Sequence, residues 1–275
     1  MNQDNNKEQK DPTKENIKFI LELFNSDSLI DAKKEIDKQI IDHPNSSILY
    51  NILGAISAGH NQFDKAIENY KKAININSNY AQAYNNLGIA FHKLDKINEA
   101  MDNYKKAINL NSNFAEAFCN LGNANRELKK PTEALLYFKK AIKIKPNYAE
   151  AFNSLGQTYQ VLHNKKEALD NFREAIKIKP NYAEAYNNLG LLLDDLMRFD
   201  ESLSSYNKAI KLKPNYEKPY NNLGNLLSDL GKYDEAKTYV DNAYELKNKD
   251  QHDETLYQIL NRKAELLYLK GNYKE

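Results

Sequence analysis

The ten residues NYAEAYNNLG at 181–190 recur along the chain with few changes. Close copies begin at residues 79, 113, 147 and 215, so that each copy begins 34 residues after the one before it. A fixed internal period of this length is typical of repeat arrays, in which each unit packs on its neighbours and no single central core is needed. We therefore predict a stack of repeats within the 275 residues of this chain.

Each 34-residue unit contains two helical patterns. In the unit 183–216, where Ala183 is position 1, apolar or small residues occupy positions 3, 4, 7, 8, 10 and 11. At 3.6 residues per turn these positions share one side of a helix, here named helix A. A second pattern follows Phe199 and predicts helix B. Proline ends a helix because it lacks a donor and restricts the residue before it, so three prolines are expected to end helix B: Pro146, Pro180 and Pro214.

The beginning of helix A carries a further signal. Three asparagines each stand three residues before a glutamate, which is the spacing of a capping box. The pairs are Asn113 with Glu116, Asn147 with Glu150, and Asn181 with Glu184. We expect these asparagines to cap the first turn of helix A.

Small residues recur where the two helices of a unit are expected to approach closely. Glycine inside a helix costs about 0.5–1 kcal/mol relative to alanine, so its repetition indicates a packing requirement. The glycines at position 8 are Gly54, Gly88, Gly122, Gly156, Gly190 and Gly224. Alanine recurs at position 20 on helix B, with Ser202 as the exception.

These positions resemble the tetratricopeptide repeat, a 34-residue helix–turn–helix unit. The resemblance implies an all-α fold, a right-handed superhelical solenoid of antiparallel helix pairs. It divides the chain into a disordered N-terminus at 1–12, a degenerate repeat at 13–46, six full repeats at 47–80, 81–114, 115–148, 149–182, 183–216 and 217–250, and a truncated repeat at 257–275.

Positions 2, 5, 6, 9, 12 and 13 of helix A are expected to point away from its apolar side. The resemblance implies that they line a concave groove that grips a partner segment. An asparagine amide offers donors and an acceptor, so a row of them can pair with a peptide backbone whatever its side chains. The row resembles the superhelical arm of O-linked N-acetylglucosamine transferases. The candidate groove residues are Asn51, Asn85, Asn86, Asn120, Asn123, Asn153, Asn187, Asn188, Asn221, Asn222, Arg126, Asp194 and Asp195. The alternative is that these are tolerated polar surface residues.

Charge is distributed unevenly along this predicted groove. Basic residues lie in its middle (His92, Lys93 and Arg126), and acidic residues follow later (Glu184, Asp194, Asp195 and Asp229). A partner segment with basic residues near the later repeats is favoured, against the alternative of a solvated face without a partner. The basic clamp with which some tetratricopeptide repeats hold chaperone tails is not expected, since only Lys218 and Arg262 are basic at the relevant positions.

No catalytic chemistry is predicted. The five histidines stand singly, without metal-ligand spacing or a recognisable nucleophile and base, and no phosphate-binding loop is present. Asp194, Asp195 and Asp229 are spread over two units without a shaped loop, which disfavours a metal ion. Cys119 is interpreted as a replacement of asparagine and not as a nucleophile. We therefore expect neither a cofactor nor a metal.

Composition excludes some classes of partner. The 39 basic and 38 acidic residues give a net charge of +1, so no global field favours nucleic acid or an anionic membrane. The polar N-terminus has no secretory signal, and no stretch approaches the roughly 20 apolar residues that span a bilayer. A cytoplasmic location is expected.

The sequence leaves three functions open. The first is a protein–protein interaction scaffold that binds a partner's peptide segment. The second is the substrate-recruiting N-terminal arm of a larger glycosyltransferase or sulfotransferase, whose catalytic domain would follow residue 275. The third is self-association through the incomplete C-terminal repeat.

Overall fold

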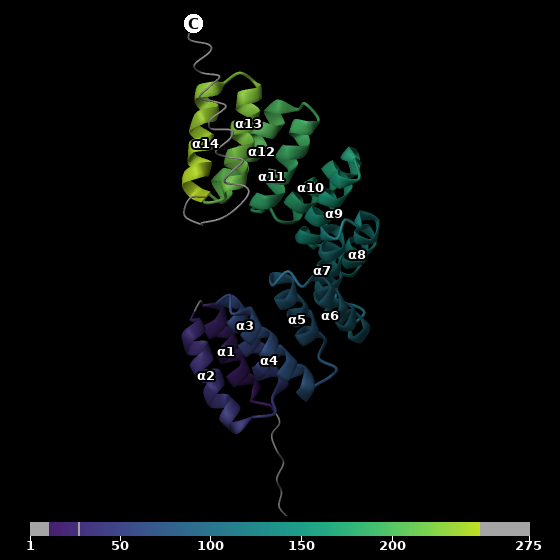
Figure 1. Ribbon diagram of the computed structural model, residues 1–275, viewed down its shortest axis with the longest axis vertical. Helices are drawn as coiled ribbons and strands as arrows, with labels where there is room; N and C mark the ends of the chain where they lie inside the picture. Colours follow the sequence, from purple (N-terminus) through teal and green to yellow (C-terminus); the bar gives the residue numbers. More distant parts are fainter. Residues whose placement is uncertain (1–10, 27, 248–275) are drawn as a thin grey trace, which may run out of the picture. The chain divides into compact units, whose positions relative to one another are not determined.

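The computed structural model describes residues 11–26 and 28–247, which form fourteen α-helices and no β-strand (Figure 1). The expected truncated repeat at 257–275 lies outside the described residues, as does most of the expected disordered N-terminus. The helices are α1 (Lys14–Asn25), α2 (Leu29–Asp42), α3 (Ser47–Gly59), α4 (Phe63–Ile76), α5 (Ala81–Lys93), α6 (Ile97–Leu110), α7 (Ala115–Glu127), α8 (Pro131–Ile144), α9 (Ala149–Val161), α10 (Lys165–Ile178), α11 (Ala183–Asp195), α12 (Phe199–Leu212), α13 (Glu217–Asp229) and α14 (Tyr233–Lys247).

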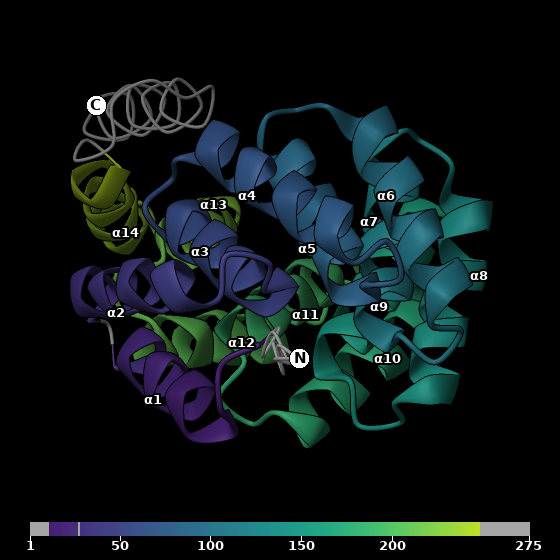
Figure 2. The same ribbon diagram turned by 90° about the horizontal axis from the view of Figure 1, so that it is seen from below.

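The helices belong to two compact units. The N-terminal unit ends at Ile144 and holds α1 to α8, and the C-terminal unit begins at Lys145 and holds α9 to α14. Within each unit, an odd-numbered helix A packs on the even-numbered helix B that follows it, and B packs on the next A. Successive A helices from α3 to α7, and from α9 to α13, also contact one another (Figure 2 shows α3 beside α5). The predicted fold class, an all-α array of helix pairs, is confirmed.

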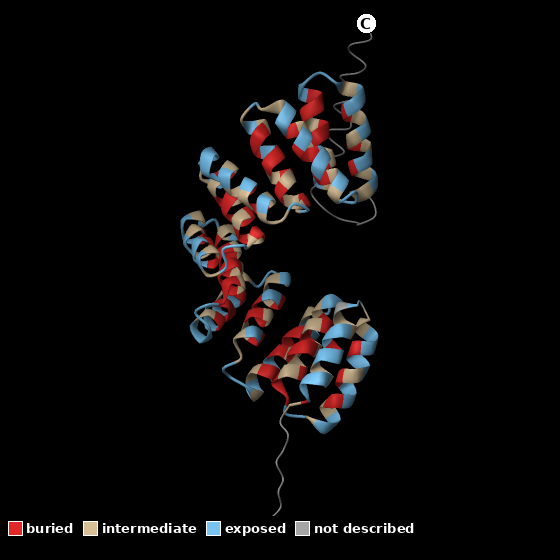
Figure 3. Cartoon of the chain, turned by 180° about the vertical axis from the view of Figure 1, so that it is seen from behind, coloured by how far each residue is buried: buried red, intermediate tan, exposed pale blue. Residues whose placement is uncertain are grey.

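At five of the six position-8 glycines an aromatic ring of helix B fills the space that the glycine leaves, and at Gly224 the side chain of Val240 fills it. A Cβ atom added to Gly88 would lie 2.6 Å from Tyr104 Cε1, and one added to Gly156 would lie 2.7 Å from Phe172 Cε1. Both rings are almost fully buried, and buried residues occupy the faces where the helices meet (Figure 3). The expected close approach of helices A and B at position 8 is confirmed. The side chain that lies against the glycine is chiefly that of position 24 and not the alanine at position 20.

Ser202, the exception in the alanine row, has its own role in this packing. Its hydroxyl is fully buried and donates a hydrogen bond of 2.8 Å to the carbonyl of Gly190 on the partner helix. A buried hydroxyl costs free energy unless it is bonded. Serine is therefore tolerated here because the glycine helix lies close enough to accept this hydrogen bond.

The turn between helix A and helix B requires a left-handed backbone at position 15 of six repeats. The residues there are Asn61, Asp95, Lys129, His163, Met197 and Gly231, with φ between 57° and 76°. Only glycine adopts this conformation without steric cost, and asparagine and aspartate tolerate it better than other residues do. Position 15 therefore requires a positive φ in these six repeats, although only its glycine, asparagine and aspartate indicate this in the sequence.

Met197 is the position at which glycine should stabilise the fold. Its side chain is 74% exposed, so little packing is lost on its removal, whereas φ is 57°. We expect Met197→Gly to raise the free energy of unfolding by about 0.5–1 kcal/mol, measured by urea denaturation. Gly231→Ala is the reciprocal variant. Nothing lies within 4 Å of an added Cβ there, so a loss of stability would come from the backbone alone. Equal stability of both variants with the parent would contradict the prediction.

The predicted C-terminal end of helix B is confirmed, whereas the predicted cap at the N-terminal end of helix A is not. Helix B ends at Ile144, Ile178 and Leu212, two residues before each proline, as predicted. The capping box is wrong. The N-cap residues of α7, α9 and α11 are Phe114, Tyr148 and Tyr182, which make no side-chain capping bond.

The asparagines assigned to that capping box lie in the preceding turn. The backbone N–H of Asn113 donates to Oδ1 of Asn111, 3.0 Å away, in a turn that the side chain of Asn111 organises. Glu150 and Glu184, assigned to the same box, form ion pairs instead with Lys179 and Lys213. The spacing of asparagine and glutamate matches a capping box, but helix A begins one residue later than that box requires, so its N-cap is the aromatic residue after the asparagine.

Candidate functional site on the A helices

The predicted groove asparagines separate into two rows with different exposure. Those at position 6, Asn86, Asn120, Asn188 and Asn222, are half-buried. Those at position 5 lie between neighbouring A helices and are buried: Asn51, Asn85, Asn153 and Asn187 are 2–8% exposed. The expectation that position 5 faces a groove is therefore wrong for these four residues. The hydrophobic pattern of a single helix did not show this burial, because the side chain at position 5 is covered by the A helix of the next repeat and not by helix B of its own repeat.

The two rows are joined by a ladder of amide hydrogen bonds. In each case Nδ2 at position 6 donates to Oδ1 at position 5 of the preceding repeat. The bonds are Asn86 to Asn51 at 3.1 Å, Asn120 to Asn85 at 3.0 Å, Asn188 to Asn153 at 2.9 Å and Asn222 to Asn187 at 3.0 Å. This amide ladder ties each A helix to the one before it within its unit. Asn221 continues the buried row in sequence, and its Oδ1 has no partner among the described residues.

Tyrosine hydroxyls accept from the other side of the position-5 amides. Nδ2 of Asn51 donates to Tyr80 Oη at 3.4 Å, and Nδ2 of Asn153 donates to Tyr182 Oη at 3.5 Å. Both tyrosines occupy the last position of their own repeat. Burial raises the pKa of Tyr80, and the hydrogen bond from Asn51 partly opposes that shift. Sequence reasoning missed these tyrosines, although their recurrence at position 34 was a usable signal.

The ladder leaves part of the position-6 amides for other contacts. Once one N–H of Nδ2 donates along the ladder, Oδ1 remains as an acceptor and the second N–H as a donor. Oδ1 of Asn86 accepts a hydrogen bond from Gln82, and Oδ1 of Asn188 accepts one from Asn187 at 3.5 Å. Asn120 and Asn222 make no such contact with described residues. These two half-buried carbonyls are the acceptors that a ligand could reach.

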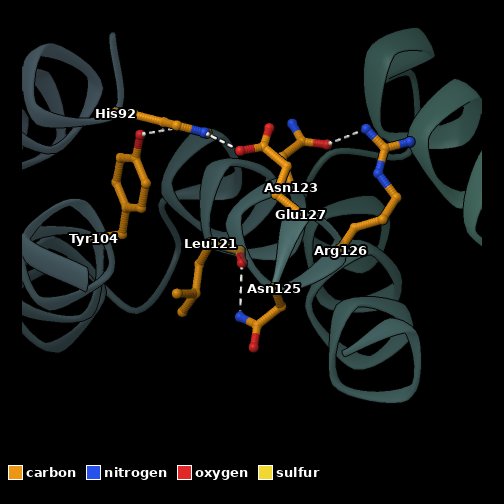
Figure 4. A network of polar contacts seen from close by, with 7 residues as sticks. All are labelled: His92, Tyr104, Leu121, Asn123, Asn125, Arg126 and Glu127. Atoms are coloured by element: carbon orange, nitrogen blue, oxygen red, sulfur yellow. Dashed lines mark hydrogen bonds and ion pairs between the residues drawn. The ribbon is translucent and has the colours of Figure 1, made fainter. Parts of the chain in front are cut away.

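A polar network joins the ends of α5 and α7 in the N-terminal unit (Figure 4). His92 Nε2 lies 2.6 Å from Glu127 Oε2, and His92 Nδ1 lies 3.5 Å from the hydroxyl of Tyr104 below it. The histidine at position 12 therefore connects the buried ring of helix B to the next A helix. The contact pairs an imidazole with a carboxylate at this end of the face.

Arg126 and Asn123 lie together on α7, as expected for residues of one face. Arg126 Nη2 donates to Asn123 Oδ1 at 3.4 Å (Figure 4). Burial lowers the pKa of Arg126, and the nearby charge of Glu127 partly opposes that shift. The neighbouring Asn125 was not a candidate; it is buried, and its amide donates to the carbonyl of Leu121 in the same helix.

Acidic side chains stand at the equivalent ends in the C-terminal unit. Asp194 and Asp195 are the last residues of α11, and Asp229 is the last residue of α13. Burial raises the pKa of Asp194, and the charges of Asp229 and Asp195 raise it further. The structure therefore brings together the three aspartates that the sequence singled out. Among the described residues, no group of three or more His, Cys, Asp or Glu side chains could hold a metal ion.

Glu184, which the sequence placed with these acids, is neutralised separately. Its Oε1 lies 2.9 Å from Lys213 Nζ. Burial would raise the pKa of Glu184, but the hydrogen bond and charge of Lys213 outweigh it and lower the pKa. Lys213 also lies 5.1 Å from the ring centre of Tyr216. Glu184 is thus paired with Lys213, the C-cap residue of α12.

A cavity of about 260 Å³ lies away from this face, between α2, α3 and α4. Its lining includes Lys33 and Asp37, which form an ion pair of 2.7 Å with each other. The rest of its polar lining includes His60, Lys65 and Glu68. Cys119, the residue that interrupts the asparagine row, is buried at 3% exposure.

Family models match most of the array. A model described as TPR repeat matches residues 60–95, 91–129 and 165–196. Two models described as tetratricopeptide repeat match 115–148 and 183–216, and 137–170 and 205–238. Together these matches run without a gap from residue 60 to residue 238. The chain belongs to the tetratricopeptide repeat family. Repeats of this family are generally non-catalytic scaffolds for protein partners.

Solved structures of other tetratricopeptide repeat proteins resemble the chain. MamA is 29% identical over 59% of this chain and 95% of its own, with a TM-score of 0.51. YrrB, described as a TPR protein with an unusual peptide-binding site, is 25% identical over 67% of this chain and 95% of its own, with a TM-score of 0.51. A tetratricopeptide repeat protein from Parabacteroides merdae is 15% identical over 91% of this chain and 98% of its own, and its TM-score of 0.71 supports the fold alone.

No curated protein matches the sequence of this tetratricopeptide repeat chain. Among the residues that the structure describes, no helix combines the length and the apolar character needed to cross a bilayer.

Proposed function

We propose that this tetratricopeptide repeat protein is an interaction scaffold that binds an extended peptide segment of a partner along its A helices. The observation that carries the proposal is the orientation of the amide ladder. Each position-6 Nδ2 donates to the preceding repeat, and the carbonyl oxygens of Asn120 in one unit and Asn222 in the other accept no hydrogen bond from a described residue. An extended peptide supplies backbone N–H donors at regular intervals, which suit such acceptors.

This orientation changes the recognition chemistry from the one that the sequence suggested. A free amide offers two N–H donors, whereas a ladder amide keeps one N–H and both lone pairs of its oxygen, so its accepting capacity exceeds its donating capacity. The binding segment is therefore recognised by its N–H groups, and proline at those positions of the segment is disfavoured. The peptide-binding site named for YrrB supports the same class of ligand, since that protein shares the fold and 25% of the aligned residues.

The test begins with peptides selected from a phage-displayed random library against the whole protein. The affinity of a selected synthetic peptide is then measured by calorimetry for the parent protein and for Asn120→Ala. Loss of one hydrogen bond is expected to weaken binding by about threefold to tenfold. A library that yields no peptide above background would overturn the proposal.

Asn85→Ala is the matched control. Asn120→Ala and Asn85→Ala both remove the 3.0 Å ladder bond between these residues. Asn85 is only 2% exposed, so a peptide cannot reach it, and its variant should bind the peptide within about twofold of the parent. Equal weakening by the two variants would mean that the ladder positions the helices but does not contact the peptide.

A further inference from the structure

We propose that the cavity between α2, α3 and α4 binds a small carboxylate that carries an apolar side chain. The cavity has a volume of about 260 Å³ and lies within the N-terminal unit, where α3 packs on both α2 and α4 (Figure 1). At about 30 Å³ per water molecule it has room for about eight waters, which suits a small organic molecule. It lies away from the amide ladder, so this site and the proposed peptide site are independent of each other.

The cavity occupies a place that is filled elsewhere in the array. In two other parts of the array, positions 11 and 14 of helix A pack with position 21 of the preceding helix B in one hydrophobic cluster. These residues are Phe91, Leu94 and Ile67 in one cluster and Leu193, Leu196 and Leu169 in the other. In the repeat that contains α3, the same positions hold Ser57, His60 and, on α2, Lys33, and all three line the cavity. Three coordinated replacements therefore leave open a space that large apolar side chains fill in other repeats.

The apolar part of the lining comes from α3. Ile56 is 1% exposed and belongs to the hydrophobic cluster that joins α1, α2 and α3, and Leu53 packs against that cluster. Both residues line the cavity. An aliphatic group that covers this surface gains free energy, because apolar area of the ligand and of the protein is removed from water together.

The acidic side chains of the lining are already paired with lysines. Asp37 Oδ2 lies 2.7 Å from Lys33 Nζ, and Glu68 Oε1 lies 2.9 Å from Lys72 Nζ. The ammonium group of Lys65, by contrast, makes no ion pair or hydrogen bond with a described residue. The charge that the lining leaves open is therefore positive, and it favours an anionic ligand.

Two further polar side chains of the lining have open hydrogen-bonding groups. Gln62 is the N-cap residue of α4, but its side chain makes no capping bond and no other bond with described residues. His60 Nδ1 donates to the carbonyl of Ile56 at 2.9 Å, and Nε2 has no partner among the described residues. The amide of Gln62 can donate to a carboxylate beside Lys65, and Nε2 of neutral His60 can accept from an N–H of the ligand. An acylated amino acid with an aliphatic side chain carries all three features.

The experiment is an NMR titration of the full chain with N-acetylleucine and with N-acetylleucinamide, which carry a carboxylate and an uncharged amide at the same place. Binding is followed through the methyl signals of Ile56, assigned with Ile56→Val. N-acetylleucine should shift these signals until they saturate, and N-acetylleucinamide should bind about fivefold more weakly or less. Equal binding of the two compounds, or no saturable shift with the acid, would overturn the proposal.

Lys65→Gln removes the open cation without filling the cavity. It should weaken N-acetylleucine binding by about threefold to fivefold and change N-acetylleucinamide binding by less than about twofold. Lys38→Gln is the matched control, because Lys38 is exposed on α2 and does not line the cavity, and the change in net charge is the same. It should bind the acid within about twofold of the parent. Equal weakening by both variants would show attraction by net charge alone, and the site would be wrong.

Ser57→Leu/His60→Leu fills the cavity with the residue type that repeat 183–216 has at both positions, Leu193 and Leu196. His60 is the C-cap residue of α3, as Leu196 is of α11, so leucine fits the backbone there. This variant should lose the response to N-acetylleucine and should raise Tm by about 2–4 °C. A folded variant that still binds the acid as the parent does would contradict the location of the site. If the variant does not fold, Lys65→Gln still decides.

A free acid and the carboxyl end of a peptide chain share this chemistry. A hexapeptide that ends in leucine with a free carboxyl group distinguishes the two sources. If it binds more tightly than N-acetylleucine and its C-terminal amide does not bind, the cavity takes a chain end. If N-acetylleucine binds and the hexapeptide does not, the cavity takes a free small acid. Both results support the carboxylate site, whereas tighter binding of the amidated hexapeptide would overturn it.

Discussion

Gly54→Leu is expected to lower the free energy of unfolding of the N-terminal unit by about 3 kcal/mol or more, because the new side chain has no space. An added Cβ at residue 54 would lie 2.5 Å from Tyr70 Cε1 and 2.6 Å from Tyr70 Cδ1. The ring cannot move aside, since it is 3% exposed and packs in one cluster with Ala66 and Leu87. The pair α3 and α4 must therefore separate.

The measurement is thermal unfolding followed by circular dichroism. A loss of this size corresponds to a decrease in Tm of about 6–12 °C for a chain of this length. Gly59→Leu, on the same helix, is the matched control. The nearest atom to a Cβ added at Gly59 is Leu29 Cδ1 at 3.5 Å, an ordinary contact, and Gly59 is exposed. Equal melting of the two variants would contradict the proposed packing role of the glycine row.

Asn153→Leu is expected to lower the free energy of unfolding of the C-terminal unit by about 2 kcal/mol. The side chains are similar in size, but leucine removes the acceptor of Asn188 Nδ2 and the donor to Tyr182 Oη. Because Asn153 is only 6% exposed, water cannot replace these bonds without opening the contact between α9 and α11. The loss is measured by urea denaturation.

A double-mutant cycle with Asn188→Ala separates the ladder bond from other effects. The losses in free energy of unfolding of the two single variants should sum to about 1 kcal/mol more than the loss of the double variant. Each single variant already breaks the ladder bond, so the double variant loses it only once. Asn171→Ala is a suitable control, because its amide bonds only within α10, to the carbonyl of Glu167. Strict additivity would mean that the ladder bond contributes nothing to stability.

The sequence predicted the helix pairs well because its strongest signals were local and repeated. Proline at position 32 and glycine at position 8 act through backbone and packing requirements within one repeat, and Pro180 and Gly156 are placed as expected. The capping box failed for a local reason. The turn before helix A is organised by Asn111 through its own side chain, which leaves Asn113 outside the helix.

The site was harder to predict because its geometry depends on neighbouring repeats. Helical periodicity of a single helix places Asn85 on the polar side, and only the next A helix buries it. In turn, the preceding A helix supplies Asn85, to which the side-chain amide of Asn120 donates. The left-handed φ of Met197 was also hidden, since position 15 varies in residue type. The transferase-arm hypothesis and self-association stay predictions, because they concern residues outside the described ones.

The hydrogen bonds of the amide ladder all have the same direction along the chain, which bears on the order in which the repeats can assemble. Every ladder donor sits one repeat later in the chain than its acceptor, as with Asn188 and Asn153 or Asn222 and Asn187. Domains and repeats emerge from the ribosome N-terminus first, so each new A helix meets an acceptor that has already been placed. Within a unit the chain can therefore add repeats as it is synthesised, and the last completed A helix offers the Oδ1 acceptor of its position-5 asparagine to the next helix.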